Sequence, residues 1–264
     1  MPYTDYKKAK IHYTDSGKGR AVVLLHGFLE SSNMWEAFTP ALSKKYRIIN
    51  IDLPGHGKSE CFGYVHTMDE MAGSVKAVLA QLKIRKVSLV GHSMGGYVAL
   101  AFGDLFPDNV KSICLFFSTS RADSTIKKKG RNQAIEVVKK SHKSFIRIAF
   151  PMLFRSKFRS TLKTEIKNAK NDALLTSKQG IIAALEGMKR RPSREMILKF
   201  APYSIHFISG VRDPVIPVDT VRAQMKISQN VSGVILKEPG HMGHIEAQKE
   251  CLAELNLFLI IGVN

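Results

Sequence analysis

Short apolar runs alternate with longer amphipathic patterns along most of the chain. The runs have apolar side chains at consecutive positions, which is typical of strands buried on both faces. Predicted strands lie at residues 21–25, 47–53, 86–90, 110–117, 204–208 and 233–236. Apolar residues at helical spacing predict helices at residues 67–82, 94–106, 218–227 and 245–260. This alternation predicts an α/β fold with a mostly parallel sheet flanked by helices.

The segment after the fourth predicted strand differs in charge from the rest of the chain. Residues 121–200 hold 21 Lys and Arg against 6 Asp and Glu, a net charge of +15, whereas the remainder holds 19 and 16, a net charge of +3. The segment has amphipathic helical stretches around 131–149 and 159–170, with breaks near Pro151 and Pro192. We therefore predict one core domain interrupted by a basic helical insert. The core comprises residues 1–120 and 200–264, and the insert comprises residues 121–199.

The remaining composition narrows the class of protein. A chain of 264 residues with 44% hydrophobic and 23% charged residues is typical of a folded globular protein. Cys61, Cys114 and Cys251 lie far apart, which predicts no disulfide framework and favours a reducing compartment. The first residues lack the apolar run of a secretory signal, and the apolar stretch 257–263 is far shorter than the roughly 20 residues that span a bilayer. We expect a cytoplasmic protein without a membrane-spanning segment.

A candidate nucleophile lies between a predicted strand and a predicted helix. The segment 91–95 reads Gly-His-Ser-Met-Gly and fits G-x-S-x-G. A sharp strand-to-helix turn needs glycines beside its central residue, and the helix N-terminus favours negative charge that develops there. The alternative is a glycine-rich turn with only a packing role. The context favours Ser93 as a nucleophile.

A serine nucleophile needs a base, and a histidine follows the last predicted strand. His241 comes directly after Pro-Gly, at the carboxyl edge of the sheet where ligands bind open α/β sheets. His244 lies nearer the next helix and is expected to cap or support it. A metal site of His241, His244 and Glu246 is a weaker alternative, since no second ligand cluster accompanies it. We expect no metal or cofactor.

An acid is needed to orient the base, and Asp213 follows the strand at 204–208. The order Ser93, Asp213, His241 is the order expected of this arrangement. Asp213 is alternatively a turn residue before Pro214, and Asp123 is the second candidate for the acid.

Two backbone amides are expected to form an oxyanion hole. Phe28 follows the strand at 21–25 in a His-Gly-Phe segment, and Met94 follows the nucleophile. His26 and His92 are expected to orient these loops by hydrogen bonding.

Five segments together resemble the α/β-hydrolase superfamily over nearly the whole chain except the insert. They are His26-Gly27-Phe28, residues 52–59 (DLPGHGKS), residues 91–96 (GHSMGG), residues 210–213 (GVRD) and Pro239-Gly240-His241. The resemblance implies that residues 52–59 form a structural loop and that the insert is a helical cap over the active site. Because Ser93 stands where dehalogenases and epoxide hydrolases have Asp, those relatives are disfavoured.

The sequence therefore predicts a serine hydrolase that cleaves carboxylic esters, with a thioester as the other acyl bond. Alternatives are an acyl-carrier-protein methyl ester esterase, a thioesterase or a non-catalytic binding protein of the same fold. We expect a small acyl ester as substrate, in an apolar pocket. The pocket residues predicted beside the catalytic residues and in the insert are Leu29, Val215, Met242, Phe145, Phe150, Met152, Phe154 and Met188. The competing interpretation is that the insert residues only pack the insert on the core.

The basic insert has two interpretations. It is either a solvated lysine-rich surface or a surface for an anionic partner or substrate, such as an acyl carrier protein, a phosphorylated thioester or an anionic membrane. Nucleic acid is not expected, because no recognisable binding module accompanies the charge.

Overall fold

The computed structural model describes residues 2–261, and within them eight strands form one sheet in the order β1-β2-β4-β3-β5-β6-β7-β8. Neighbouring strands are parallel along the part of the sheet that runs β4-β3-β5-β6-β7-β8. Strands β1 and β2 extend it at one end through antiparallel pairs. The strands are β1 (Tyr3–Tyr6), β2 (Ala9–Ser16), β3 (Ala21–Leu25), β4 (Arg47–Ile51), β5 (Val87–His92), β6 (Val110–Phe116), β7 (Ser204–Gly210) and β8 (Val231–Leu236). The six predicted strands are confirmed, with shifted ends, and the fold class is confirmed.

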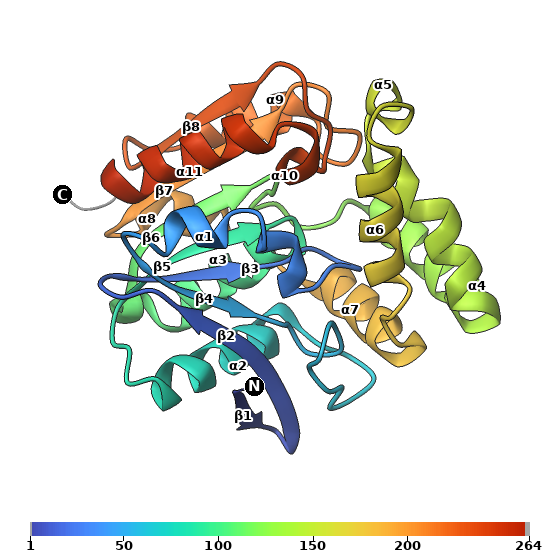
Figure 1. Cartoon of the computed structure of the whole chain (residues 1–264), viewed down its shortest axis with the longest axis horizontal. Helices are drawn as coiled ribbons and strands as arrows, with labels where there is room; N and C mark the ends of the chain where they lie inside the picture. Colours follow the sequence, from blue (N-terminus) through green and yellow to red (C-terminus); the bar gives the residue numbers. More distant parts are fainter. Residues whose placement is uncertain (1, 262–264) are drawn as a thin grey trace.

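The core helices lie in two layers, one on each face of the sheet (Figure 1). They are α1 (Thr39–Leu42), α2 (Met68–Gln81), α3 (Met94–Leu105), α9 (Val218–Met225), α10 (Gly243–Glu246) and α11 (Gln248–Ile261), with the short 3₁₀ helices η1 (Ser32–Trp35) and η2 (Pro107–Asn109). Alternation along β3 shows the two layers: Val23 and Leu25 pack in the cluster that contains α2 and α3. Val22 and Leu24 pack in the cluster that contains α1 and α11.

Two differences from the predicted elements have local causes. The antiparallel strands β1 and β2 carry mixed polar and apolar residues, so no continuous apolar run marks them. The predicted helix at 245–260 is divided, because Ala247 leaves helical geometry (φ −144°) between α10 and α11. Within residues 2–261 no helix has both the length and the apolar character required to cross a bilayer. The apolar stretch 257–263 lies partly outside the described residues.

The chain between β6 and β7 folds into helices beside the sheet, on the side to which the arrow of β3 points (Figure 1). They are α4 (Thr125–Ala149), η3 (Phe150–Leu153), α5 (Ser156–Arg159), α6 (Lys163–Ala173) and α7 (Lys178–Arg190). The last helix before β7, α8 (Glu195–Phe200), instead lies with the core and contacts α3 (Figure 1). Helix α4 is bent at Ser141, whose backbone is extended (φ −157°, ψ 92°). The helical content of residues 121–199 agrees with the sequence pattern, but α7 was not predicted separately.

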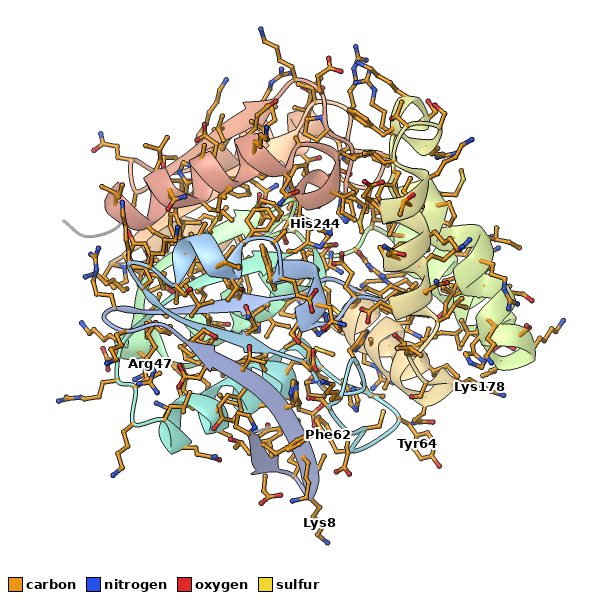
Figure 2. All side chains as sticks on the ribbon, in the orientation of Figure 1. Lys8, Arg47, Phe62, Tyr64, Lys178 and His244 are labelled. Carbon is orange, nitrogen blue, oxygen red and sulfur yellow. The ribbon has the colours of Figure 1, made fainter. Side chains whose placement is uncertain are left out.

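Polar contacts tie the insert to the core at several points. Asp172 of α6 accepts hydrogen bonds from Ser31 Oγ (2.6 Å) and Asn33 Nδ2 (2.9 Å). At the start of α7, Gln179 donates to the carbonyl of Gly63 (2.8 Å). Figure 2 shows the neighbouring Tyr64 and Lys178 on the outer edge of this contact. The insert is therefore held against the loops that follow the parallel strands.

Candidate active site

Ser93 lies at a sharp turn between β5 and α3. Its backbone is in a left-handed conformation (φ 49°, ψ −109°) that residues other than glycine rarely adopt. A Cβ on Gly91 would lie 2.3 Å from the backbone carbon of Gly95, and a Cβ on Gly95 would lie 2.5 Å from the carbonyl oxygen of Leu25. The glycines that flank Ser93 in the motif therefore permit the turn.

His241 and Asp213 complete a chain of hydrogen bonds with Ser93. His241 Nε2 lies 2.9 Å from Ser93 Oγ, and His241 Nδ1 lies 2.8 Å from Asp213 Oδ2. The other carboxylate oxygen of Asp213 accepts the amides of Val215 (2.7 Å) and Ile216 (3.0 Å). Because this carboxylate accepts from the ring, Nδ1 carries a proton and Nε2 is free to accept the proton of the Ser93 hydroxyl. The structure thus brings together the three residues that the sequence singled out.

The loop that carries His241 is fixed by contacts on both sides. The amide of His241 donates to the carbonyl of Leu153 in the insert (3.2 Å). Glu246 accepts hydrogen bonds from the amides of Gly240 and Arg155. Its carboxylate therefore supports the loop backbone, which differs from the metal-ligand role considered from the sequence.

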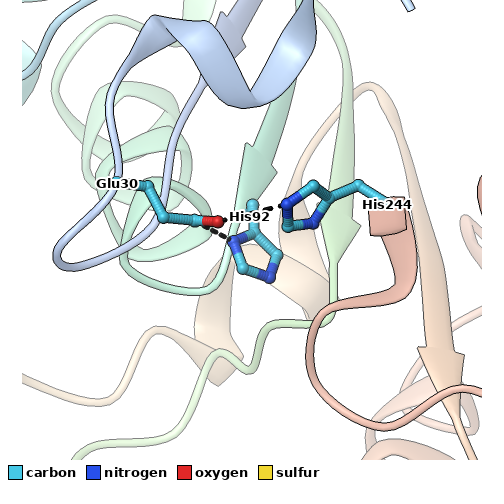
Figure 3. A group of neighbouring side chains, drawn as sticks. All are labelled: Glu30, His92 and His244. Carbon is cyan, nitrogen blue, oxygen red and sulfur yellow. Dashed lines mark hydrogen bonds and ion pairs between the residues drawn. The ribbon is translucent and has the colours of Figure 1, made fainter. Parts of the chain in front are cut away.

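A buried group of three ionisable side chains, Glu30, His92 and His244, lies behind this loop (Figure 3). His92 Nδ1 is 2.6 Å from Glu30 Oε2, and His92 Nε2 is 3.0 Å from the carbonyl oxygen of His241. Both ring nitrogens of His92 face acceptors, so both donate and the ring is an imidazolium. His244 Nε2 lies 3.3 Å from Glu30 Oε1. The predicted supporting role of His244 thus corresponds to a contact with Glu30, a residue that sequence reasoning missed.

The electrostatics of this group agree with a charged pair and one neutral ring. Burial acts to lower the pKa of His92, but the carboxylate of Glu30 raises it above its ordinary value. Burial also acts to raise the pKa of Glu30, and the charge of His92 lowers it to about 2. Burial lowers the pKa of His244 to about 4. The 2.6 Å between Glu30 and His92 fits a hydrogen bond, whereas two ligands of a tetrahedral zinc ion would be about 3.3 Å apart.

One candidate oxyanion-hole residue, Phe28, lines the same cavity as Ser93, and the other, Met94, directly follows Ser93 in the chain. Phe28 follows β3, and its turn is held by the amide of Gly27, which donates to Glu30 Oε2 (2.8 Å). Met94 is the first residue of α3, where helix amides lack intrahelical acceptors. His26 accepts from the amide of Leu53 (2.9 Å) and thereby fixes the position of this turn.

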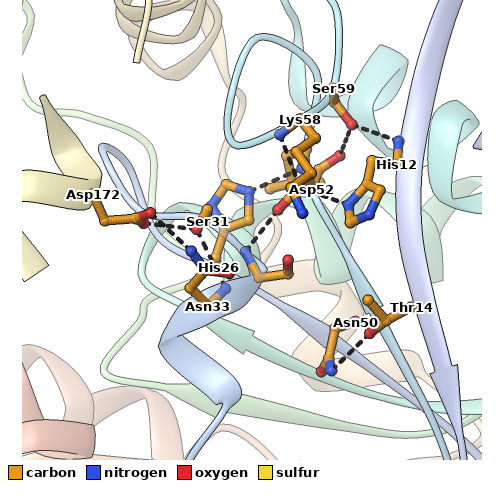
Figure 4. Close-up of polar contacts among 12 residues, drawn as sticks. His12, Thr14, His26, Ser31, Asn33, Asn50, Asp52, Lys58, Ser59 and Asp172 are labelled. Carbon is orange, nitrogen blue, oxygen red and sulfur yellow. Dashed lines mark hydrogen bonds and ion pairs between the residues drawn. The ribbon is translucent and has the colours of Figure 1, made fainter. Parts of the chain in front are cut away.

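The loop after β4 is held by a buried carboxylate (Figure 4). Asp52 accepts the amides of Ser32 (2.7 Å) and Lys58 (2.9 Å) and contacts His12 Nδ1 (2.8 Å). Burial acts to raise the pKa of Asp52, but His26 and the amide donors hold it below its ordinary value. These contacts support a structural function for the loop at residues 52–59.

A cavity of about 390 Å³ opens at Ser93 and His241. Five of the eight predicted pocket residues line it, and so does Phe28, which is predicted for the oxyanion hole; the five are Leu29, Phe145, Met188, Val215 and Met242. The other three predicted pocket residues do not. Phe150 and Phe154 are buried in the hydrophobic cluster that the insert shares with the core, and Met152, in η3, is 57% exposed. Tyr97, Lys127 and Arg131 line the cavity and were not predicted.

Asp123, the second candidate for the acid, has other partners. Its buried carboxylate contacts Arg131 Nε and Arg191 Nη1, the latter at 2.8 Å. Burial acts to raise its pKa, but the two guanidinium groups hold it below its ordinary value. Asp213 therefore occupies the place beside His241, and Asp123 links the insert to the loop after β6.

The burial of His56, in the loop at residues 52–59, predicts that the fold loses stability in acid. His56 is fully buried beside His26, and burial lowers its pKa to about 3. An unfolded histidine binds a proton near pH 6.5, so between about pH 6.5 and 3 the unfolded state holds one more proton than the folded state. The free energy of unfolding should therefore fall on acidification, by about 1.4 kcal/mol per pH unit for this group.

The measurement is urea unfolding between pH 7 and 4 for the wild type and His56→Asn. Asparagine keeps a donor near the carbonyl of Pro54, which His56 Nδ1 contacts at 3.2 Å. The variant should lose stability less steeply on acidification. An identical slope in both proteins would show that His56 titrates normally.

Comparisons with known proteins agree with this architecture. Residues 20–248 match the family model of the alpha/beta hydrolase fold. An esterase from Thermogutta terrifontis superposes with a TM-score of 0.92 at 26% identity, over 97% of this chain and 95% of that chain. An enol-lactonase from Burkholderia xenovorans superposes with a TM-score of 0.91 at 21% identity, over 98% and 100% of the two chains.

One curated relative is the dihydrolipoyllysine-residue acetyltransferase component of the acetoin cleaving system from Pseudomonas putida. It is 29% identical over 249 residues, which cover 91% of this chain and 64% of the relative. The chain thus spans less than two thirds of that protein's length. The family match extends from β3 to the start of α11 and includes Ser93, Asp213 and His241. The chain belongs to the alpha/beta hydrolase fold family.

Proposed function

We propose that this protein is a serine hydrolase that cleaves carboxylic esters through an acyl-enzyme. The observation that carries the proposal is the hydrogen-bonded chain from Ser93 Oγ through His241 to Asp213 at the wall of a cavity. A hydroxyl in this chain can lose its proton to the imidazole as it attacks a carbonyl carbon.

In the first half of the proposed reaction, Ser93 Oγ attacks the ester carbonyl while His241 Nε2 accepts the hydroxyl proton. Asp213 holds the ring and stabilises the imidazolium. The amides of Phe28 and Met94 donate to the oxyanion. His241 then gives its proton to the leaving alkoxide, which departs as an alcohol. Water repeats the sequence against the acyl-enzyme and releases the acid and free Ser93.

The shape of the cavity supports a short or medium acyl group. Its walls are largely apolar and come from both the core and the insert, including Leu29, Phe145 and Met188. In this proposal the insert acts as a cap, because helices α4 and α7 supply part of the wall opposite Ser93. A volume of about 390 Å³ is at the small end of the range for ligand pockets.

The test combines covalent labelling with turnover. A fluorophosphonate probe should label the wild type at Ser93 with a 1:1 stoichiometry, as read by intact mass and peptide mapping. A panel of 4-nitrophenyl esters from acetate to dodecanoate should show a maximum at short or medium length, and thioesters of the same acids serve as the comparison. Folded protein that is neither labelled nor active on any ester would refute the proposal and favour a binding function.

A further inference from the structure

The wall of the cavity opposite the core carries positive charge. Lys127 and Arg131, one turn apart on α4, line the same cavity as Ser93 and His241. Arg191 lies beside them, with its guanidinium 3.8 Å from the centre of the Tyr97 ring. The side chain of Arg131 is 19% exposed and that of Arg191 is 3% exposed. The two guanidinium groups are therefore largely removed from water, whereas Lys127 lies at the exposed mouth of the cavity.

The acidic groups around these cations do not balance them. Asp123 is shared between Arg131 and Arg191. Glu30 also lines the cavity, but its carboxylate is paired with His92. Asp213 also acts on Lys127, although it is hydrogen-bonded to His241. The three cations Lys127, Arg131 and Arg191 thus face the two carboxylates of Asp123 and Asp213, a net charge of +1. Such a surplus in a partly desolvated wall is costly unless an anion enters the cavity.

Both cavity cations retain donors for a ligand. Asp123 occupies Nε and Nη2 of Arg131, which leaves Nη1 outside that contact. Lys127 Nζ donates one hydrogen bond to the carbonyl of Val215 (3.2 Å), and an ammonium has three donors. Burial and the charges of Arg191 and Arg131 lower the pKa of Lys127, whereas the carboxylates of Asp123 and Asp213 act to raise it.

We propose that the substrate of this site is an ester that carries a free carboxylate, such as the half-ester of a dicarboxylic acid. The carboxylate binds Lys127 and Arg131 while the ester carbonyl lies at Ser93. This inference rests on the proposed hydrolase function and adds the class of substrate. A carboxylate is favoured over a larger phosphorylated group because the cavity is small and a guanidinium matches a planar carboxylate.

The experiment compares monomethyl adipate with dimethyl adipate, which has the same chain without the charge. Wild-type kcat/KM should be about tenfold or more higher for the half-ester, because charge-assisted hydrogen bonds are strong in a desolvated site. In Lys127→Gln this preference should fall about tenfold, chiefly through KM. Raising the salt concentration should reduce it as well. The matched control is Lys128→Gln, an exposed neighbour outside the described lining, which should retain the preference.

A binding measurement separates the two proposals. Calorimetry on Ser93→Ala should show the half-ester binding about tenfold or more tighter than the diester, and Lys127→Gln in that background should remove the difference. Turnover of both esters without a preference would overturn the substrate class and leave the hydrolase proposal intact. Selective binding without turnover of any ester would overturn the hydrolase proposal alone. Equal effects of the Lys127 and Lys128 variants would refute the carboxylate site.

Discussion

Replacement of Ser93 by alanine should lower kcat on the best ester by about 10⁴-fold or more, the usual loss when a catalytic triad loses its nucleophile. The hydroxyl is 2.9 Å from His241 Nε2, and no other hydroxyl is hydrogen-bonded to that nitrogen within residues 2–261. The fold should remain intact, because alanine keeps the backbone turn and removes one oxygen. The measurement is steady-state kinetics beside thermal unfolding of both proteins.

Two further variants sharpen this test. His241→Ala should cost about as much as Ser93→Ala, and the double variant should lose little more, because residues that act as a unit are not additive. Ser43→Ala, at the half-buried end of α1, is the matched control and should retain full activity. Activity retained in Ser93→Ala on every ester would mean that another group is the nucleophile.

The parallel part of the sheet was predictable because its physics is local. Strands buried on both faces must be apolar at successive positions, as in Val22-Val23-Leu24-Leu25. An amphipathic helix instead has polar residues between its apolar ones. The turn at Ser93 was also predictable from the sequence. A side chain on Gly91 would collide with Gly95, and one on Gly95 would collide with Leu25 of the adjacent β3. The antiparallel strands β1 and β2 were missed because the pairing between them, rather than their composition, makes them strands.

The candidate site was predictable where topology alone places residues together. Ser93, Asp213 and His241 each follow a parallel strand, so the sheet edge collects them. The partners of His92 and the charges at Lys127 and Arg131 depend on how distant loops and the insert pack. Glu30 and His92 are 62 positions apart in the chain, and no spacing rule connects them. Met152 lies in the short η3 turn and is exposed, which pattern reasoning also does not predict.

Replacement of Glu30 by alanine should reduce the free energy of unfolding by about 3–5 kcal/mol, as expected when one partner of a buried ion pair is removed. The side chains of Glu30 and His92 are 5% and 2% exposed, so water cannot replace the lost carboxylate. Glu30 also accepts the amide of Gly27 and contacts His244, and both groups lose a partner in the variant. Urea unfolding at pH 7 measures the loss. Exposed Glu36, six residues away, provides the control variant Glu36→Ala, which should change stability by less than about 0.5 kcal/mol.

The pH dependence identifies the cause of this loss. The pKa of Glu30 is lowered to about 2 in the folded state, below its ordinary value near 4.5. Its contribution to stability is therefore complete above about pH 4.5 and disappears as the pH falls through about 2. The stability difference between the wild type and Glu30→Ala should shrink over that same interval. When His92 is already replaced by Gln, the further change Glu30→Ala should lower the free energy of unfolding by a smaller amount than it does in the wild type. The difference should exceed about 1 kcal/mol, because no imidazolium is left unpaired. A stability difference that stays constant from pH 7 to 2, with additive single variants, would mean that Glu30 acts by filling space and that its charge does not stabilise the loop of His241.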